Sequence, residues 1–131
     1  MAAELSATQV EFLREKHIAH VVTLLGDGSP HVTPIWVDTD GKAVLINTAR
    51  GRVKERNLAR DPRVAISIAD ESDIYRWLAI RGRAQLVDGG ATELINALNQ
   101  KYTGNPDYPL PLGEKRVTVR IIPERISGTV L

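Results

Sequence analysis

The sequence contains no cysteine and no long apolar run. Without cysteine the protein has no disulfide, no thiolate nucleophile and no cysteine-ligated metal, and this composition is typical of a reducing compartment. No apolar run approaches the roughly eighteen residues that a membrane-spanning helix needs. The first ten residues, MAAELSATQV, have neither a basic segment nor an apolar core. We therefore expect a cytoplasmic protein without a signal peptide and without a membrane partner.

An excess of charge of either sign is also missing. Lys and Arg number 17 and Asp and Glu number 16, so the net charge is +1. A nearly neutral chain gives no general support for binding nucleic acid. The length is enough for one hydrophobic core, and the ordinary apolar content argues against disorder. We expect residues 1–131 to form a single domain.

Several catalytic signatures are absent. The sequence has no Gly-x-Ser-x-Gly motif, no Walker loop and no Rossmann fingerprint, so hydrolase, nucleoside-triphosphatase and classical nicotinamide functions lack support. His17 and His20 are three residues apart, but they fall across a predicted helix end and strand start, so the ligand spacing of a helix fails. We expect no metal site.

The residue patterns predict six or seven strands and three short helices. The helices are expected over 7–16, 51–60 and 91–102, and the strands over 17–25, 31–37, 42–47, 64–69, 74–87, 115–122 and 126–130. Tight turns at 26–29 and 38–41 join the first three strands, and Gly82 predicts a bulge in the long strand. This order predicts a mainly β protein with short helices, folded as a small antiparallel barrel.

The segment 47–63, NTARGRVKERNLARDPR, concentrates positive charge at the start of a predicted helix. Its basic residues are Arg50, Arg52, Lys54, Arg56, Arg60 and Arg63. Cations in the first helical turn oppose the helix dipole, whereas the backbone N–H groups there have no partner within the helix. We interpret the segment as a site for an anion, most naturally a phosphate. The alternative is a solvated charged helix.

Two strands carry further candidate binding residues. Pro34 within the strand 32–36 lacks an N–H, and a flat heterocycle could lie along this strand beside Trp36; an edge strand with a core tryptophan is the alternative. In the strand 74–87, alternation places Tyr75, Trp77, Ala79 and Arg81 on one face, which could meet a ligand or a partner subunit. The alternative for this face is an ordinary amphipathic strand.

A family resemblance covers essentially the whole chain. It is clearest in residues 28–68, GSPHVTPIWVDTDGKAVLINTARGRVKERNLARDPRVAISI, and is followed by the Arg-Gly-Arg-Ala sequence at 81–84. This stretch resembles the split β-barrel flavin and deazaflavin oxidoreductases, the superfamily of pyridoxamine 5′-phosphate oxidase. It is most similar to small actinobacterial members that use the deazaflavin coenzyme F420. The resemblance implies an FMN-binding split barrel that forms a homodimer, with two cofactor sites at the subunit interface.

The resemblance also implies roles for individual residues. The strand that flanks the cofactor ring corresponds to Thr33, Pro34, Ile35 and Trp36. The end of the next strand, beside the ribityl chain, corresponds to Asn47 and Thr48. The phosphate-binding turn and helix correspond to Arg50, Gly51, Arg52, Lys54 and Asn57. The strand that can reach the neighbouring subunit's site corresponds to Trp77, Ala79 and Arg81.

The function implied by the resemblance is an oxidoreductase that transfers a hydride from ring carbon C5 of reduced coenzyme F420 to an unsaturated organic small molecule. No catalytic residue stands out; the candidate proton donors are Tyr75, Tyr108 and the solvent. One alternative is an FMN enzyme of the pyridoxamine 5′-phosphate oxidase type, and another is a coenzyme carrier without turnover. The loop 104–113, with Tyr108, either closes over the site or only connects its neighbours.

Overall fold

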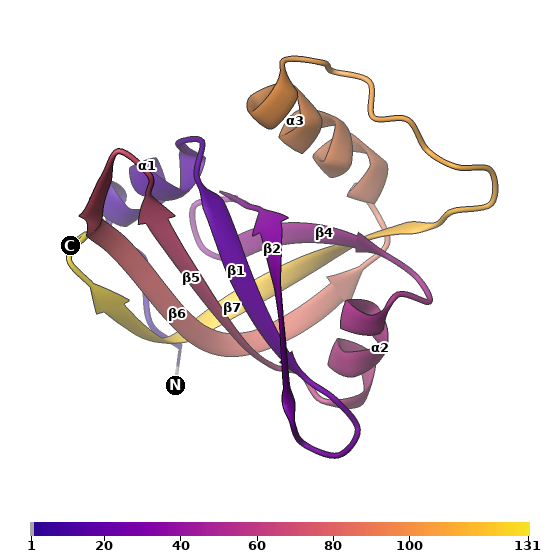
Figure 1. Ribbon diagram of the computed structural model, residues 1–131, viewed down its shortest axis with the longest axis horizontal. Coiled ribbons are helices and arrows are strands. Elements are labelled where there is room, and N and C mark those ends of the chain that lie inside the picture. Colours follow the sequence, from indigo (N-terminus) through magenta and orange to yellow (C-terminus); the bar gives the residue numbers. More distant parts are fainter. Residues whose placement is uncertain (1) are drawn as a thin grey trace.

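The computed structural model describes residues 2–131. In chain order the elements are α1 (Ala7–Arg14), β1 (Ile18–Leu24), β2 (Pro30–Trp36), β3 (Asp38–Thr39), β4 (Val44–Ala49), α2 (Val53–Arg60), β5 (Arg63–Asp70), β6 (Asp73–Val87), α3 (Ala91–Thr103) and β7 (Arg116–Gly128). The strands form one antiparallel sheet with the order β2-β1-β5-β6-β7-β4-β3. The sheet is strongly curled, and α1 and α2 lie at opposite ends of it (Figure 1). This confirms the predicted mainly β fold.

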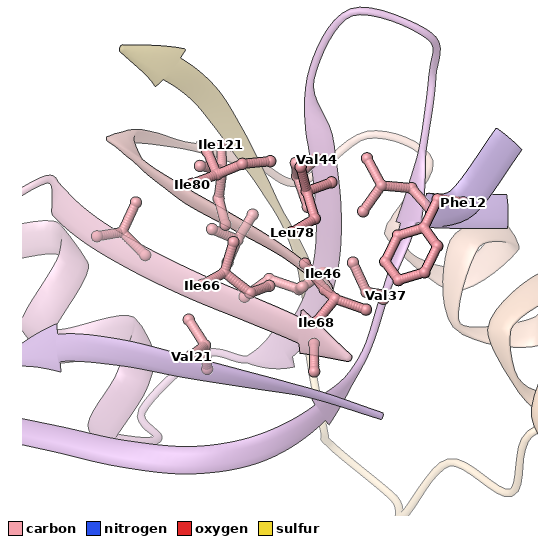
Figure 2. Packing of buried hydrophobic residues seen from close by; sticks show 14 of the residues in the cluster. Phe12, Val21, Val37, Val44, Ile46, Ile66, Ile68, Leu78, Ile80 and Ile121 are labelled. Atoms are coloured by element: carbon pink, nitrogen blue, oxygen red, sulfur yellow. The ribbon is translucent and has the colours of Figure 1, made fainter. Parts of the chain in front are cut away.

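The inner face of the curled sheet holds the core (Figure 2). Alternate residues of neighbouring strands point inward, as the period of a half-buried strand requires. The fully buried inward side chains include Val21, Ile46, Ile66, Ile68, Leu78, Ile80, Val119 and Ile121. Phe12 and Leu13 of α1 close one end of this core. Leu58 of α2 is buried in the same core. The helices therefore seal an interior that the sheet alone leaves open.

The helix α1 begins where its sequence predicts. Ser6 Oγ accepts a hydrogen bond from the backbone N–H of Gln9 at 3.1 Å, and Gln9 Oε1 accepts one from the N–H of Ser6 at 2.9 Å. This reciprocal pair satisfies two backbone donors that the helix itself leaves free. Among residues 2–131, no helix is both long and apolar enough to cross a membrane.

Two predicted boundaries were wrong. The strands expected on either side of Pro123 form one continuous strand, β7, because Pro123 lies opposite a register shift between Arg81 and Gly82. A bulge at this point disrupts the regular ladder, so the missing N–H of the proline does not end the strand. In addition, Asp38–Thr39 is a short strand rather than part of a turn, and it pairs with the start of β4.

Gly82 permits the close approach of β6 and β7 at this bulge. A Cβ atom on Gly82 would lie 2.0 Å from the carbonyl oxygen of Ile122. We expect Gly82→Ala to lower the free energy of unfolding by about 1–3 kcal/mol, because the two backbones must separate. Urea denaturation measures this change. Gly89→Ala is the control, since its Cβ would meet nothing within 4 Å; equal losses in both variants would contradict the packing argument.

Candidate functional site

A cavity of about 380 Å³ lies where the two ends of the curled sheet approach each other. Its walls come from β1, β2, β4 and β7 and from the helices α2 and α3. The apolar wall consists of Ile18, Pro34, Ile35, Trp36, Ile95 and Leu98. The polar end consists of Asn47, Thr48, Arg52, Lys54 and Arg116. The cavity therefore joins a flat apolar surface to a cluster of three cations, which suits a ligand with a ring at one end and an anion at the other.

Trp36 is held in place by two tyrosines. The rings of Trp36 and Tyr102 are stacked, with centroids 5.3 Å apart and an angle of 5° between the planes. Tyr108 meets Trp36 edge-on at 6.4 Å. One face of the indole is thus already covered by α3, and a ligand can use only the remaining surface. Tyr108 belongs to the loop 104–113, so this loop packs beside the cavity and does more than connect α3 to β7.

Lys54 is a half-buried cation without an acidic partner among residues 2–131. Its Nζ donates a hydrogen bond to Thr33 Oγ1 at 2.8 Å. Burial, and then the nearby positive charge of Arg52, lower the pKa of Lys54 below its ordinary value. Two cations are therefore held close together in the same cavity wall, and a bound anion would relieve both the repulsion and the lost hydration.

Arg116 is a cavity residue that the sequence analysis missed. It is 8% exposed, and its Nε donates to Asn47 Oδ1 at 2.8 Å. Asn47 in turn donates through Nδ2 to the carbonyl oxygen of Ala91 at 2.9 Å, at the start of α3. Arg116 also lies over the ring of Tyr108, 5.3 Å from its centroid. The local signal was the basic pair of Lys115 and Arg116 at the start of an apolar strand, and it did not reveal which residues Arg116 contacts.

The start of α2 differs in part from the expected phosphate-binding turn. The backbone N–H of Gly51 donates to Glu55 Oε1 at 2.9 Å, and Glu55 is buried. This donor is therefore engaged within the chain. Arg52 occupies the N-cap position, where no side chain accepts a hydrogen bond from the helix. The cavity thus meets the start of α2 through the Arg52 and Lys54 side chains.

Two other predicted phosphate ligands point elsewhere in this structure. Arg50 forms a bidentate ion pair with Asp88, with its Nη2 atom 2.9 Å from both carboxylate oxygens. Asn57 is buried and donates to Thr23 Oγ1 at 3.0 Å, while its Oδ1 accepts from Arg60. Neither residue lines the cavity. Asn57 instead ties α2 to β1.

The predicted residues of β6 lie on the outer face of the sheet. Within one chain, β1 and β5 separate β6 from β2. β7 lies directly beside β6, but Ala79 and Arg81 pair with Ser127 and Arg125 near its end, whereas Arg116 of the cavity begins this strand. Trp77, Ala79 and Arg81 also alternate with the inward-facing Leu78 and Ile80, and none of the three lines the cavity. Ala79 and Arg81 line a separate hollow on this face. Their expected contact with a neighbouring subunit's site stays a prediction.

One acidic cluster has metal-like spacing among residues 2–131. The ligand atoms of Glu15, His17 and Asp70 all lie within 4.8 Å of one another. Arg76, however, donates to Glu15 Oε1 at 3.0 Å and to Asp70 Oδ2 at 2.8 Å. A guanidinium already supplies the positive charge there, so we interpret the cluster as an ion-pair network that ties α1 to β5 and β6.

The family model described as pyridoxamine 5′-phosphate oxidase matches residues 5–129. This chain belongs to that family. The match confirms both the family resemblance and the split-barrel fold that the sequence analysis predicted. Much of the cavity lining belongs to β2, β4 and the start of α2, which lie within residues 28–68. The helix α3 and the strand β7 complete the lining from later parts of the chain.

Known relatives and solved structures resemble this chain over most of its length. A Mycobacterium tuberculosis protein (strain CDC 1551 / Oshkosh) described as an F420H(2)-dependent biliverdin reductase is 28% identical over 127 residues, which are 95% of this chain and 88% of the relative. A solved structure described as an F420 reductase is 28% identical, with a TM-score of 0.79 over 89% of this chain and 94% of that chain. A conserved hypothetical protein from Mycobacterium tuberculosis is 26% identical, with a TM-score of 0.76 over 95% and 84% of the two chains.

The charge of Lys54 makes a testable prediction about pH. We expect the affinity for a phosphate monoester such as FMN to fall as pH rises through the lowered pKa of Lys54, because deprotonation removes a cation from the cavity. The second phosphate pKa of about 6 keeps the ligand charge constant above pH 7.5. Fluorescence titration between pH 7.5 and 9.5 measures the change. Lys54→Arg should flatten the profile, and an identical decline in that variant would contradict the assignment.

Proposed function

We propose that this protein is an oxidoreductase that uses reduced coenzyme F420 to transfer a hydride to an unsaturated organic small molecule. The observation that carries the proposal is that Arg52 and Lys54 lie together at the end of a cavity with an apolar wall, and that Lys54 has no acidic partner among residues 2–131. The family match, and the coenzyme F420 dependence described for two similar proteins, support the same activity.

The residues of the cavity fit such a coenzyme. Arg52 and Lys54 would hold the phosphate, because charge-assisted hydrogen bonds to phosphate are the strongest that these side chains make. Asn47 and Thr48 would lie beside the sugar-alcohol chain, whose hydroxyl groups need polar partners. The ring would rest on the surface formed by Pro34, Ile35 and Trp36, as the resemblance implies. When bound, the deazaflavin supplies the hydride chemistry, and the protein supplies position and shielding.

The chain's own residues would exclude water and orient the ligand. Ile95 and Leu98 of α3 give the cavity an apolar wall opposite the cations, which limits the water around a reacting ring. The cavity lining contains no Asp, Glu, His or Tyr side chain that could act as a general acid. Tyr75, one of the two candidate proton donors, is 81% exposed on β6 and does not line the cavity. The proton that follows the hydride would therefore come from solvent or from Tyr108, which packs against Trp36.

We also infer that a second copy of the chain completes the site. Trp77, Ala79 and Arg81 lie on the outer face of the sheet and do not line the cavity of their own chain. A symmetric homodimer could bring this face to the partner's cavity, in the arrangement that the resemblance implies. Sedimentation that finds only monomers at micromolar concentrations would exclude this assembly.

The FMN enzyme remains the second candidate, because the matching family is named for a pyridoxamine 5′-phosphate oxidase. The relatives described as using coenzyme F420 favour the deazaflavin. The acidic tail of that coenzyme also accounts more readily for several clustered cations than a single phosphate does. Absorption and fluorescence titration with each cofactor distinguishes the two, and tight FMN binding without deazaflavin binding would reject the first proposal.

Removing either cation of the pair should weaken coenzyme binding. We expect Arg52→Ala and Lys54→Met each to cost about 1–3 kcal/mol, or roughly 5-fold to 150-fold in the dissociation constant, because each loses a charge-assisted hydrogen bond. Arg56→Ala is the matched control, since Arg56 is exposed on the same helix and does not line the cavity. Equal effects of all three substitutions would indicate general electrostatics rather than a phosphate site.

Turnover separates an enzyme from a carrier. We expect the protein to catalyse oxidation of the reduced deazaflavin by at least one member of a panel of enones, quinones and linear tetrapyrroles, followed as the return of the oxidised coenzyme's absorbance. The Lys54→Met variant serves as the low-affinity control at equal coenzyme concentration. Tight binding with no oxidation across the panel would instead identify a coenzyme carrier.

A further inference from the structure

Arg116 presents one fixed hydrogen-bond donor to the cavity. Its Nε atom donates to Asn47 Oδ1, its Nη1 atom donates to Glu114 Oε1, and its guanidinium lies over the ring of Tyr108. Its Nη2 atom has no hydrogen-bond partner among residues 2–131, although it is not one of their fully buried unpartnered atoms. The side chain is only 4% exposed and lines the cavity, so the N–H groups of Nη2 are open to a ligand there.

Glu114 balances the charge of this arginine. Its side chain is 13% exposed, and the hydrogen bond from Arg116 is the main cause that lowers the pKa of Glu114, so the carboxyl group is ionised at neutral pH. Lys54, by contrast, has no acidic partner in the part of the chain that the structure describes. A fully charged anion is therefore better served by Lys54, whereas Arg116 suits an oxygen that is neutral when it binds.

Arg116 lies between the two ends of the cavity. It covers the ring of Tyr108, which meets Trp36 of the apolar wall edge-on. On its other side, Glu114 joins it to Arg52 at the cationic end. Its contacts hold the guanidinium in place before any ligand binds, which is the property required of a group that stabilises charge as it develops in a reaction.

We propose that Arg116 is a catalytic residue that binds the carbonyl oxygen of a substrate whose C=C bond is conjugated to that carbonyl group. The inference rests on the proposed function and names the part of the substrate that this residue holds. Hydride addition forms a C–H bond at the β-carbon, and the electron pair of the C=C bond shifts so that negative charge develops on the carbonyl oxygen. This enolate oxygen, bound at Nη2, is nearer to the guanidinium than to Glu114, so the hydrogen bond strengthens as the charge develops.

The reaction balances without a general acid. The hydride comes from the reduced coenzyme, which is thereby oxidised and whose ring proton returns to solvent. A solvent proton then bonds to the α-carbon of the enolate and restores the carbonyl group, so the substrate gains one hydride and one proton. Because Arg116 stabilises the enolate until that proton arrives, the absence of Asp, Glu, His and Tyr side chains from the cavity lining is consistent with turnover.

The first test is Arg116→Lys, which keeps a positive charge beside Glu114 but loses the planar fork of N–H groups. Turnover with the reduced coenzyme is measured with cyclohexenone and with a cationic phenazinium dye, which takes up a hydride without forming an oxyanion. We expect kcat for the enone to fall at least about tenfold more than kcat for the dye, because one donor to a developing oxyanion contributes about 10²–10³ in kcat. The dissociation constant of the coenzyme should change little.

Arg120→Lys is the matched control. It is the same substitution on the same strand, and Arg120 pairs with Asp40 and does not line the cavity. It should leave the ratio of enone to dye turnover unchanged. The double variant Arg116→Gln with Glu114→Gln removes both charges together, so neither is left unpaired in the fold. It should lose the enone activity as selectively as Arg116→Lys does.

A nitrophenol gives a readout that needs no turnover, because its ionised oxygen mimics the enolate. Bound to the protein with the oxidised coenzyme, para-nitrophenol should ionise at a lower pH than it does free in solution, and the absorbance of the phenolate measures this shift. Arg116→Lys should reduce the shift, whereas Arg120→Lys should preserve it.

Three results would overturn the inference and leave the proposed function intact. They are an equal loss of enone and dye turnover in Arg116→Lys, a large loss of coenzyme affinity in that variant, and a nitrophenol whose ionisation is the same in the wild type as in Arg116→Lys. Wild-type turnover of the dye alone would also overturn it. A wild-type protein that binds no coenzyme would reject the proposed function, and the inference with it.

Discussion

The sheet curls without closing, and the rest of the structure depends on this constraint. β2 forms one end of the strand order and β3 the other, with β4 next to β3. β2 approaches β4, but the two strands are not hydrogen-bonded to each other. Pro34 removes a backbone donor from β2, which suits a strand that must remain an edge. The gap between these edges is covered by helices, and it is there that the cavity forms.

The position of the cations follows from the same gap. α2 connects β4 to β5, so its first turn must begin where β4 ends, beside the open edge of the barrel. Lys54 reaches across this gap to Thr33 of β2. A half-buried lysine that donates only to a hydroxyl destabilises the folded protein, because the lost hydration of its charge is not fully compensated. The anionic ligand proposed for this cavity would compensate that loss.

The segment between α3 and β7 links the apolar and charged parts of the site. Tyr108 packs against Trp36 and beneath Arg116, and Glu114 joins Arg116 to Arg52. A displacement of this segment would therefore change the shape of the apolar wall of the cavity and the charge at its cationic end together.

The sequence by itself determined the order and type of most elements and the concentration of cations at the start of α2, but not the short strand β3 or the continuity of β7 across Pro123. These follow from local patterns: alternation in the strands, glycine in the turns and the residues 47–63. The family resemblance then indicated the fold and the coenzyme class. Only the tertiary structure decided which cations share the cavity. Arg116 enters it by contact with Asn47, 69 residues away, whereas Arg50 is drawn to Asp88. Local sequence cannot determine such contacts, because they are set by the register of strand pairing and by side chains that compete for the same carboxylates.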